Sequence, residues 1–337
     1  MTLTKAQSRK HAEAIKLLEK EELTFDEKCF VFEHFHEGGD SNNKVASAHF
    51  TPYDLANDLK LDIHGHKILD ICAGIGILSF AYLNGYDHQY QPKLVCVEIN
   101  PRYVEVGKKL LPEAEWICGD IFDPEIQKKL KGRGFDTAIS NPPFGKNAMG
   151  DKKAPRYKGN LFEYAVIDIA SDLAEYGAFI IPQGSSPFLY SGVQWYQDCR
   201  RPTSRDPQPG QGQANMRKYQ PFFDATGIDL SVGAGVDTSI YIEEWRGVAP
   251  KTEIVTAEFE EVQAARRAVR AAEVVSEGHT KEITLDDAHN PDYAEFFEGL
   301  KEAQGVANSL VDTPEFKALV ARSTHNQAVD PVQLALF

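Results

Sequence analysis

The chain of 337 residues has no run of eighteen consecutive apolar residues, so we expect no membrane-spanning helix. Its first 22 residues are polar and helical in pattern, without the apolar segment of a secretion signal. The five cysteines form no Cys-x-x-Cys pair, which argues for reduced thiols rather than a zinc or disulfide framework. These absences predict a cytoplasmic protein without a metal site, and 42% hydrophobic residues are enough for a substantial core.

Positive charge is also scarce, because the formal net charge is −14. A strongly negative chain repels the phosphates of nucleic acid, so this net charge argues against nucleic-acid binding. Two segments, 146–158 and 200–218, are nevertheless basic, while acids concentrate after residue 252. This distribution is compatible with a basic face on an acidic protein. The basic residues are Lys146, Lys152, Lys153, Arg156 and Lys158 in the first segment, and Arg200, Arg201, Arg205, Arg217 and Lys218 in the second.

Short apolar runs alternate with helical patterns through the middle of the chain. This alternation predicts an α/β fold with a mostly parallel sheet covered by helices on both faces. A later strand pair brings the expected sheet to seven strands. The expected strands are 67–72, 93–98, 115–118, 135–140, 177–182, 229–232 and 239–245, and the expected helices are 52–60, 77–83, 101–111, 124–130, 161–173 and 257–275.

A small-residue turn, Ala73-Gly74-Ile75-Gly76, follows the first expected strand. Such residues allow a sharp turn and let a ligand approach the backbone closely. A dinucleotide-binding fingerprint would need a third glycine at position 79, which is Ser79.

Acids lie at or just beyond the ends of the first three expected strands: Asp70, Glu98 and Asp120. Glu98 is placed to accept both hydroxyls of a ribose. Asp120 is placed to accept from an adenine amino group, with Ile121 and Phe122 against the ring. Three carboxylates would repel a pyrophosphate but suit a nucleoside that carries a sulfonium cation. The pattern therefore favours S-adenosylmethionine (AdoMet) over NAD as cofactor.

The fourth expected strand ends at Asn141-Pro142-Pro143-Phe144. An Asn amide oxygen and a backbone carbonyl can each accept one hydrogen of an exocyclic NH₂ group, and a neighbouring aromatic ring can hold a base flat. These four residues are the candidate catalytic residues for methylating the N6 nitrogen of adenine.

The order of these elements, starting at Phe50-Thr51-Pro52, resembles the γ-class amino-methyltransferases of DNA, in their N6-adenine branch. The resemblance covers about residues 45–245 and implies a Rossmann-like class I AdoMet-dependent fold with a helical segment before it. It implies that Thr51 and Pro52 contact the methionine end of AdoMet, and that Asp70, Ala73, Gly74 and Gly76 line its amino-acid portion. Glu98 would then bind ribose, and Asp120, Ile121 and Phe122 the adenine ring. Asn141 and the Pro142 carbonyl would hold the target N6, with Phe144 stacked on the target base, and Asn141 would also contact the cofactor.

In duplex DNA the target base must first be flipped out of the helix. We expect the basic residues of 146–158 to hold phosphates around it, and Tyr157 to add stacking. Sequence-reading relatives carry a substantial recognition domain, whereas here the expected catalytic domain, 49–248, follows a helical segment, 1–48, and precedes an acidic tail, 249–332. The 191–220 insertion, with Arg200, Arg201, Arg205 and Trp195, is the expected substitute. We therefore expect short or relaxed sequence specificity.

The chain ends with Gln333-Leu334-Ala335-Leu336-Phe337. This is similar to the pentapeptide by which bacterial DNA polymerases and repair proteins dock on the sliding clamp. Gln333 would bond at the rim, and Leu334, Leu336 and Phe337 would supply the apolar contact. The alternative is a terminal helix that packs on its own core. With the family resemblance, this predicts a DNA-associated protein of bacterial or phage origin.

Two other functions fit the same residues. Asn-Pro-Pro-aromatic also serves RNA and protein-glutamine methyltransferases, although the upstream Phe50-Thr51-Pro52 and the basic insertion favour DNA. A non-catalytic AdoMet-binding subunit of a DNA-modification or restriction-modification system is the second alternative, and the intact Asn141 and Phe144 argue against it.

Overall fold

The computed structural model describes residues 4–36, 50–85, 91–144, 149–206, 208–245 and 250–267. These belong to one compact unit that ends at Phe259 and to the start of a second unit at Glu260, and the fold below is that of the first. Within the described ranges, no helix is both long and apolar enough to cross a membrane.

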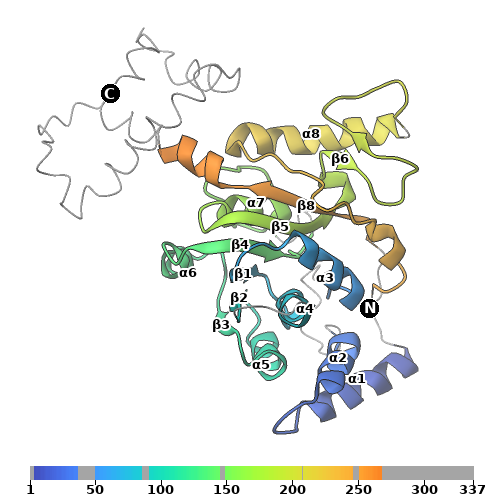
Figure 1. Ribbon diagram of the computed structural model, residues 1–337, viewed down its shortest axis with the longest axis vertical. Helices are drawn as coiled ribbons and strands as arrows, with labels where there is room; N and C mark the ends of the chain where they lie inside the picture. Colours follow the sequence, from blue (N-terminus) through green and yellow to red (C-terminus); the bar gives the residue numbers. More distant parts are fainter. Residues whose placement is uncertain are drawn as a thin grey trace, which may run out of the picture. The chain divides into compact units, whose positions relative to one another are not determined.

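A central sheet of six strands organises this unit (Figure 1). Five strands run parallel, and β8 pairs antiparallel with β5 at one edge. The order is β3-β2-β1-β4-β5-β8, which confirms the expected Rossmann-like, mostly parallel sheet. The strands are β1 (Lys67–Ile71), β2 (Lys93–Glu98), β3 (Glu115–Cys118), β4 (Phe135–Ser140), β5 (Ala174–Pro182) and β8 (Thr252–Glu258).

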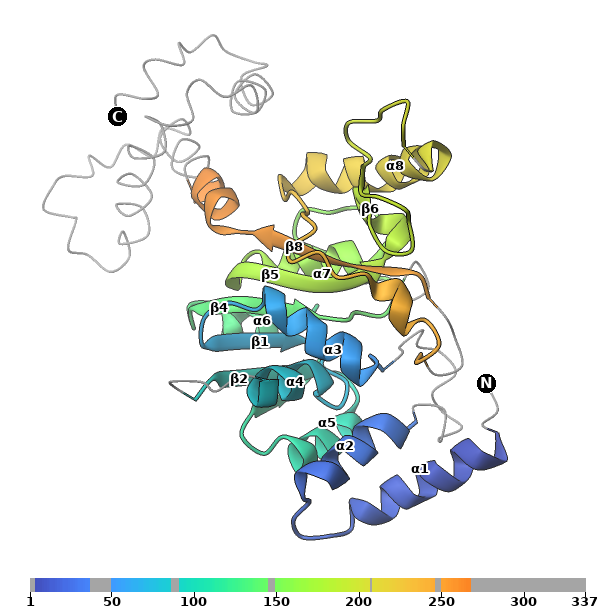
Figure 2. The same ribbon diagram turned by 45° about the vertical axis from the view of Figure 1, so that its right-hand side comes forward.

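Helices cover both faces of the sheet, as expected (Figure 2). From β1 to β3 the chain moves across the sheet in one direction, and from β3 through β4 to β5 it moves in the other. Right-handed connections therefore place the helices after β1 and β2 on one face and the helices after β3 and β4 on the other face. The first face carries α3 (Tyr53–Leu59), α4 (Ile77–Gly85) and α5 (Pro101–Leu110), and the second carries α6 (Pro124–Leu130) and α7 (Phe162–Ala170).

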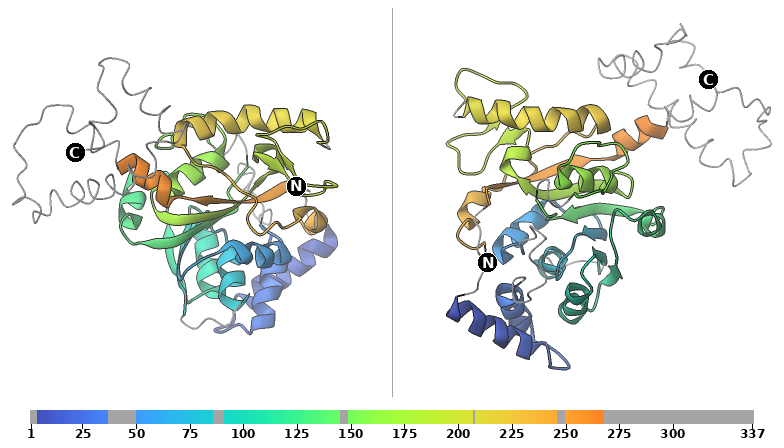
Figure 3. Two further views of the ribbon diagram at one scale, coloured as in Figure 1. Left: turned by 45° about the horizontal axis from the view of Figure 1, so that its top comes forward. Right: turned by 180° about the vertical axis from the view of Figure 1, so that it is seen from behind.

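Two N-terminal helices lie beside α4 and α5 (Figure 3). They are α1 (Lys5–Leu17) and α2 (Phe25–His34), and each begins with a capping box, at Thr4 and Thr24. Phe32 of α2 packs on Phe80 of α4 with ring centroids 4.6 Å apart. The expected helical segment 1–48 therefore contains two helices, and its residues 1–3 and 37–48 lie outside the described ranges.

The expectation of seven strands was wrong for the described residues. The segment 229–232 contributes only an isolated bridge between Ser231 and Thr256, and Gly233 and Gly235 follow with φ angles of +60° and +75° that turn the chain. The expected strand 239–245 instead begins with the 3₁₀ helix η5 (Thr238–Tyr241).

The sheet also continues past residue 248, where the catalytic domain was expected to end, because β8 begins at Thr252. This strand covers the start of the expected helix 257–275. Its burial on nearly every residue comes from pairing with β5, a partner seventy residues away in sequence at Pro182–Thr252.

The 191–220 segment is more ordered than the surface loop that its composition predicts. It contains β7 (Gln197–Asp198), which pairs with β6 (Phe188–Leu189) as a small hairpin, and most of α8 (Pro209–Thr226). The helix α8 packs against β6 and against the 3₁₀ helix η4 (Gln183–Ser185), which directly follows β5 (Figure 1).

Candidate cofactor and substrate site

The carboxyl ends of β1 and β4 lie side by side, at the point where the strand order reverses. In open α/β sheets, ligands bind in the crevice beyond such a switch point. The register pairs Asp70 with Ile139, so the glycine turn after β1 faces Asn141 after β4. The two candidate motifs, seventy residues apart in sequence, therefore meet at one edge of the sheet.

Asn141 is held by Thr51 through a hydrogen bond of 2.8 Å from Asn141 Nδ2 to Thr51 Oγ1. Thr51 is only 2% exposed. This bond assigns the nitrogen end of the amide to Thr51, so the oxygen Oδ1 is the acceptor end of the side chain. The N-cap position of α3 belongs to Pro52, and the Thr51 side chain bonds to Asn141.

The rest of the Asn141–Phe144 motif forms a partly apolar wall. Pro142 is buried, while Pro143 and Phe144 are half-buried. Phe144 packs against the main hydrophobic core together with Phe50, which precedes Thr51. Phe144 therefore has one face against the protein, and stacking of its ring on a target base stays a prediction.

The turn after β1 has the left-handed backbone that its small residues predict. Gly74 and Gly76 have φ angles of +57° and +91°. Cys72 also has a positive φ, +58°, which is unusual for a residue with a side chain. Ala73 is buried, and a Cβ on Gly74 would lie 3.1 Å from the Phe50 ring. Phe50 and the turn are thus closely packed, and this ties the Phe50-Thr51-Pro52 segment to the glycine turn.

Glu98 joins the turn to the end of β2. Its two carboxylate oxygens accept hydrogen bonds from the Gly74 N–H (2.9 Å) and the Asn100 N–H (2.8 Å). Burial raises the pKa of Glu98, and these hydrogen bonds oppose that increase. Each oxygen keeps a second lone pair, which is the acceptor pattern that ribose hydroxyls require.

Asp70 lies under the turn. It is fully buried, and its Oδ2 accepts from both the N–H (3.3 Å) and the hydroxyl (2.7 Å) of Ser79 on α4. Asp70 was expected to line the amino-acid portion of the cofactor. Its contribution there is indirect, because its side chain holds α4, the helix that follows the turn. Its Oδ1 accepts no hydrogen bond within the described part of the chain. Burial raises the pKa of Asp70 from its ordinary value of 3.8 to about 7.

A raised pKa makes the stability of the protein depend on pH at this residue. The folded state favours protonated Asp70, so its contribution to stability is fully present below about pH 4 and is lost as pH rises towards 7. We expect Asp70→Asn, which keeps an acceptor for Ser79, to gain stability relative to the parent across this window. Chemical unfolding at pH 4 to 8 checks this. The advantage of the variant should grow by up to about 1.4 kcal/mol per pH unit and level off above pH 7, and a difference independent of pH would contradict the assignment.

Asp120, the expected partner of the cofactor adenine, forms an ion pair with Lys152. Its Oδ1 also accepts from the Phe122 N–H at 3.1 Å, and the Lys152 Nζ lies 5.5 Å from the centre of the Phe122 ring. Ile121 is buried, and Phe122 is half-buried against Phe162. Lys152 was expected to hold a DNA phosphate, but it lies against Asp120 and Phe122, the two residues expected to bind the cofactor adenine.

We therefore expect Lys152→Ala to bind AdoMet several-fold more tightly than the parent. The substitution removes both the competitor for the Asp120 carboxylate and a positive charge beside a cationic ligand. Isothermal titration with AdoMet measures the effect. Lys153→Ala is the matched control, because Lys153 is exposed and adjacent. Weaker binding in Lys152→Ala would instead make Lys152 a cofactor contact.

Two further residues of the 146–158 segment make their contacts within the protein itself. Arg156 pairs with Asp168 and Asp172 of the α7 region at 2.9 and 2.6 Å. Tyr157 is 5% exposed, with its ring edge-on to Tyr164 and Phe222. The expected stacking of Tyr157 on nucleic acid is wrong for this conformation because its ring is part of the core, and Arg156 is neutralised by its own chain.

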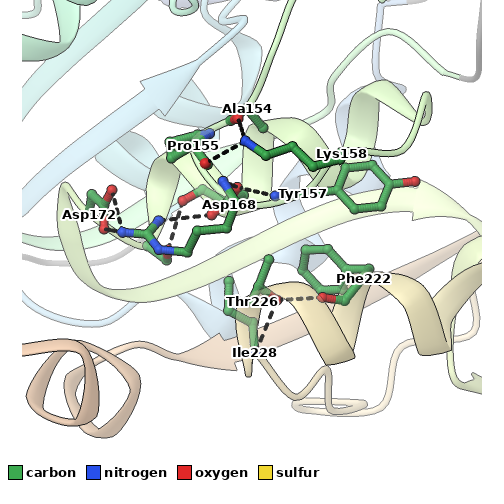
Figure 4. A network of polar contacts seen from close by, with 11 residues as sticks. Ala154, Pro155, Tyr157, Lys158, Asp168, Asp172, Phe222, Thr226 and Ile228 are labelled. Atoms are coloured by element: carbon green, nitrogen blue, oxygen red, sulfur yellow. Dashed lines mark hydrogen bonds and ion pairs between the residues drawn. The ribbon is translucent and has the colours of Figure 1, made fainter. Parts of the chain in front are cut away.

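The other basic residues of this segment differ in environment. Lys158 is exposed and donates to the carbonyls of Ala154 and Pro155 (Figure 4). Lys153 is exposed. Lys146 lies outside the described residues. Of the expected phosphate contacts in 146–158, only Lys153 and Lys158 are thus presented on the described surface.

In the 191–220 segment, Arg200 is committed to acids of the same chain. It bonds to Asp198 at 2.8 Å and to Asp229 at 2.6 Å. Arg201 and Arg205 are exposed, and within the described residues their guanidinium groups form no ion pair. The first of the three expected DNA contacts is therefore a structural ion pair, and the other two face solvent.

Two buried acids that the sequence analysis did not single out anchor the loops around the site. Asp168 of α7 accepts from the Arg156 and Tyr157 N–H groups, at 2.6 and 2.8 Å. Glu253 of β8 accepts from Tyr190 and Ser191 at the start of the insertion. A single acid inside the apolar stretch 165–170 is a signal for a buried anchor at Asp168. The position of Glu253 gave no such signal, because β8 itself was not predicted.

Residues 53–172 match the model of the methyltransferase small domain family. The match covers less than half of the chain, but it contains the glycine turn, the three acids and residues 141–144. No curated protein sequence matches the chain.

Solved structures similar to this chain include methyltransferases of several kinds. The methyltransferase subunit of a type I restriction-modification system from Streptococcus thermophilus is 15% identical, with a TM-score of 0.41, over 69% of this chain and 48% of its own. Fibrillarin from Aeropyrum pernix, solved with natively bound S-adenosyl-L-methionine, is 14% identical, with a TM-score of 0.37, over 61% of this chain and 75% of its own. A proposed RNA methyltransferase from Pyrococcus horikoshii is 22% identical, with a TM-score of 0.34, over 47% of this chain and 74% of its own.

The chain thus spans about half of the restriction-modification subunit. The strand order and the switch-point site are those of the Rossmann-like class I methyltransferases. Together with the family match to residues 53–172, they support an AdoMet-dependent methyltransferase.

Proposed function

We propose that the protein transfers the methyl group of AdoMet to the N6 nitrogen of adenine in DNA, after flipping the base out of the helix. The observation that carries this proposal is the bond from Asn141 Nδ2 to Thr51 Oγ1. It fixes a side-chain carbonyl oxygen at the switch point, next to the Pro142 carbonyl. Two fixed acceptors and a neighbouring aromatic ring suit an exocyclic amino group of a planar base.

The residues around the turn fit AdoMet in charge and in hydrogen bonding. When bound, this cofactor supplies an electrophilic methyl group on a sulfonium. Glu98 offers acceptors to ribose, and Asp120 and Phe122 offer an acceptor and a ring to adenine. The carboxylates of Glu98 and Asp120 make this edge acidic, which favours a cationic ligand.

Catalysis by these residues is then mainly positioning. An adenine amino nitrogen is a weak nucleophile because its lone pair is delocalised into the ring. Asn141 Oδ1 and the Pro142 carbonyl favour a pyramidal nitrogen and the positive charge that develops on it during attack. Phe144 holds the base in the plane that aligns this nitrogen with the methyl group, an orientation effect of up to about 7–11 kcal/mol. The proton that N6 loses passes to solvent.

DNA is the proposed substrate on the basis of the Phe50-Thr51-Pro52 element and the exposed cations Lys153, Lys158, Arg201 and Arg205. We propose short or relaxed sequence specificity for the same chain. We also propose that residues 333–337, which lie outside the described residues, dock on a bacterial sliding clamp. Titration of the clamp with the full chain and with Leu336→Ala/Phe337→Ala tests that contact.

The deciding experiment is incubation of the purified protein with labelled AdoMet and unmethylated duplex DNA, followed by digestion and mass spectrometry of the nucleosides. N6-methyladenine is the expected product, and the positions of the methylated sites define the sequence preference. Parallel reactions with RNA and with a glutamine-containing protein extract test the two other substrate classes. Label in either of those, with none in DNA, would overturn the proposal.

A further inference from the structure

Two neighbouring aromatic side chains, Trp195 and Tyr196, are exposed in the loop of the small β6–β7 hairpin, directly before β7, and are called the aromatic tip. Their exposed fractions are 48% and 43%. The hairpin follows η4, and η4 directly follows the carboxyl end of β5. Since β5 is the neighbour of β4 in the sheet, this aromatic tip belongs to the same sheet edge as Asn141.

The aromatic tip is held rigidly. The Trp195 indole N–H donates to the Arg205 carbonyl at 3.2 Å, and the Tyr196 ring lies 5.9 Å from the buried Phe188 ring. The next residue, Gln197, is 1% exposed and exchanges two hydrogen bonds with the Gln208 backbone, at 3.0 and 3.2 Å. Side chains ordered in advance lose little entropy when they bind a partner.

Hydrogen bonds and ion pairs hold the two ends of the hairpin loop. Glu253 is 1% exposed and receives hydrogen bonds from the Tyr190 N–H (3.0 Å), the Ser191 N–H (3.0 Å) and the Ser191 hydroxyl (2.7 Å). Arg200, just after β7, is fixed by Asp198 and Asp229. Two charged side chains, the buried Glu253 and the paired Arg200, therefore fix the position of a loop whose aromatic residues are exposed.

The charges around the aromatic tip indicate the partner. Arg201 and Arg205 are exposed on the segment after β7, and Arg217 and Lys218 are exposed on α8, which packs against β6. Exposed aromatic rings among cations that form no ion pair within the described residues match the surface that nucleic-acid strands require, because bases stack on the rings and phosphates neutralise the cations.

We propose that Trp195 and Tyr196 stack on bases next to the target adenine, while Arg201 and Arg205 hold the flanking phosphates. This inference rests on the proposed DNA function and assigns the contact that extrudes and frames the target nucleotide. Site preference then resides in this hairpin, without a separate recognition domain.

The test compares the parent with Trp195→Ala/Tyr196→Ala and with Trp195→Phe/Tyr196→Phe, which keeps the rings. Binding of a fluorescently labelled DNA duplex and methyl transfer to the same duplex are both measured. Loss of a stacked base typically weakens binding by about tenfold or more, so we expect at least a tenfold rise in Kd and KM in the alanine variant and near-parental values in the phenylalanine variant. The Kd for AdoMet should be unchanged.

Leu61→Ala is the control for loss of exposed apolar surface. Leu61 is 50% exposed and lies in the 3₁₀ helix η2 (Lys60–Asp62), which precedes β1 and so belongs to the opposite edge of the sheet. Arg201→Gln/Arg205→Gln should weaken binding and make it less dependent on salt concentration.

The outcomes separate the two proposals. Methylation of DNA with an unchanged Kd and KM in the alanine variant overturns the stacking inference and leaves the proposed function intact. A second outcome is that the parent binds DNA without methylating it and that the alanine variant no longer binds DNA. This result supports the nucleic-acid surface and overturns the proposed reaction. Parent protein that neither binds nor methylates DNA overturns both.

Discussion

Replacing Asn141 with alanine is expected to lower kcat for methyl transfer by about 10²–10³, the usual effect of removing one fixed hydrogen-bonding group that stabilises a transition state. The affinity for AdoMet should change far less, because the proposed ribose and adenine contacts are Glu98 and Asp120. Single-turnover methylation of DNA, with AdoMet binding measured separately, distinguishes the two effects. An active Asn141→Ala variant would show that the amino group is held elsewhere.

Thr51 provides the matched pair of variants for this prediction. Thr51→Ser keeps the hydroxyl that accepts from Asn141 Nδ2 at 2.8 Å, whereas Thr51→Val keeps the volume and removes the acceptor. We expect near-parental kcat for the serine variant and about a tenfold loss for the valine variant, because the freed amide no longer holds its oxygen in one position. Equal rates in both would mean that Thr51 acts only through packing.

Replacing Asp168 with alanine is expected to cost about 3–5 kcal/mol of the free energy of unfolding. Asp168 is fully buried, and its loss leaves two backbone N–H groups without their acceptor and removes one of the two carboxylates that pair with the Arg156 guanidinium (Figure 4). The same loss detaches residues 156 and 157 from α7, so methyl transfer should fall as well. Chemical unfolding measures the stability.

Asp172→Asn is the control for this second prediction. Asp172 bonds to the same Arg156, but its side chain is 36% exposed, and an exposed ion pair contributes only about 0–1 kcal/mol. The two variants thus separate burial from charge. A similar cost for both would contradict the idea that Asp168 is the buried anchor of this loop.

Much of the fold was predictable because its signals are local. Continuous apolar runs marked β2, β3 and β4 to the residue, and the helix at 124–130 was marked by Pro124 in its first turn. The motif order also placed the glycine turn and Asn141 at one edge, since parallel strands end together. The strand pair expected at 229–245 failed because two glycines with positive φ turn the chain there.

Partners of charged and aromatic side chains were not predictable in the same way. Lys152, Arg156 and Tyr157 form one basic, aromatic stretch in the sequence, typical of a nucleic-acid contact. In the structure, Lys152 pairs with Asp120, Arg156 pairs with Asp168, and the Tyr157 side chain is buried in the core. The two ion-pair partners, Asp120 and Asp168, lie 32 and 12 residues away along the chain.

The sequence by itself therefore determined the order of strands and helices, the small-residue turn and the residues available for chemistry. Periodicity and backbone preference act over a few residues and can be read without a partner. Only the tertiary structure decided that Thr51 orients Asn141, 90 residues away, and that β8 closes the sheet. Hydrogen bonds and ion pairs form between whichever groups the packed chain brings together, and that pairing depends on the whole fold.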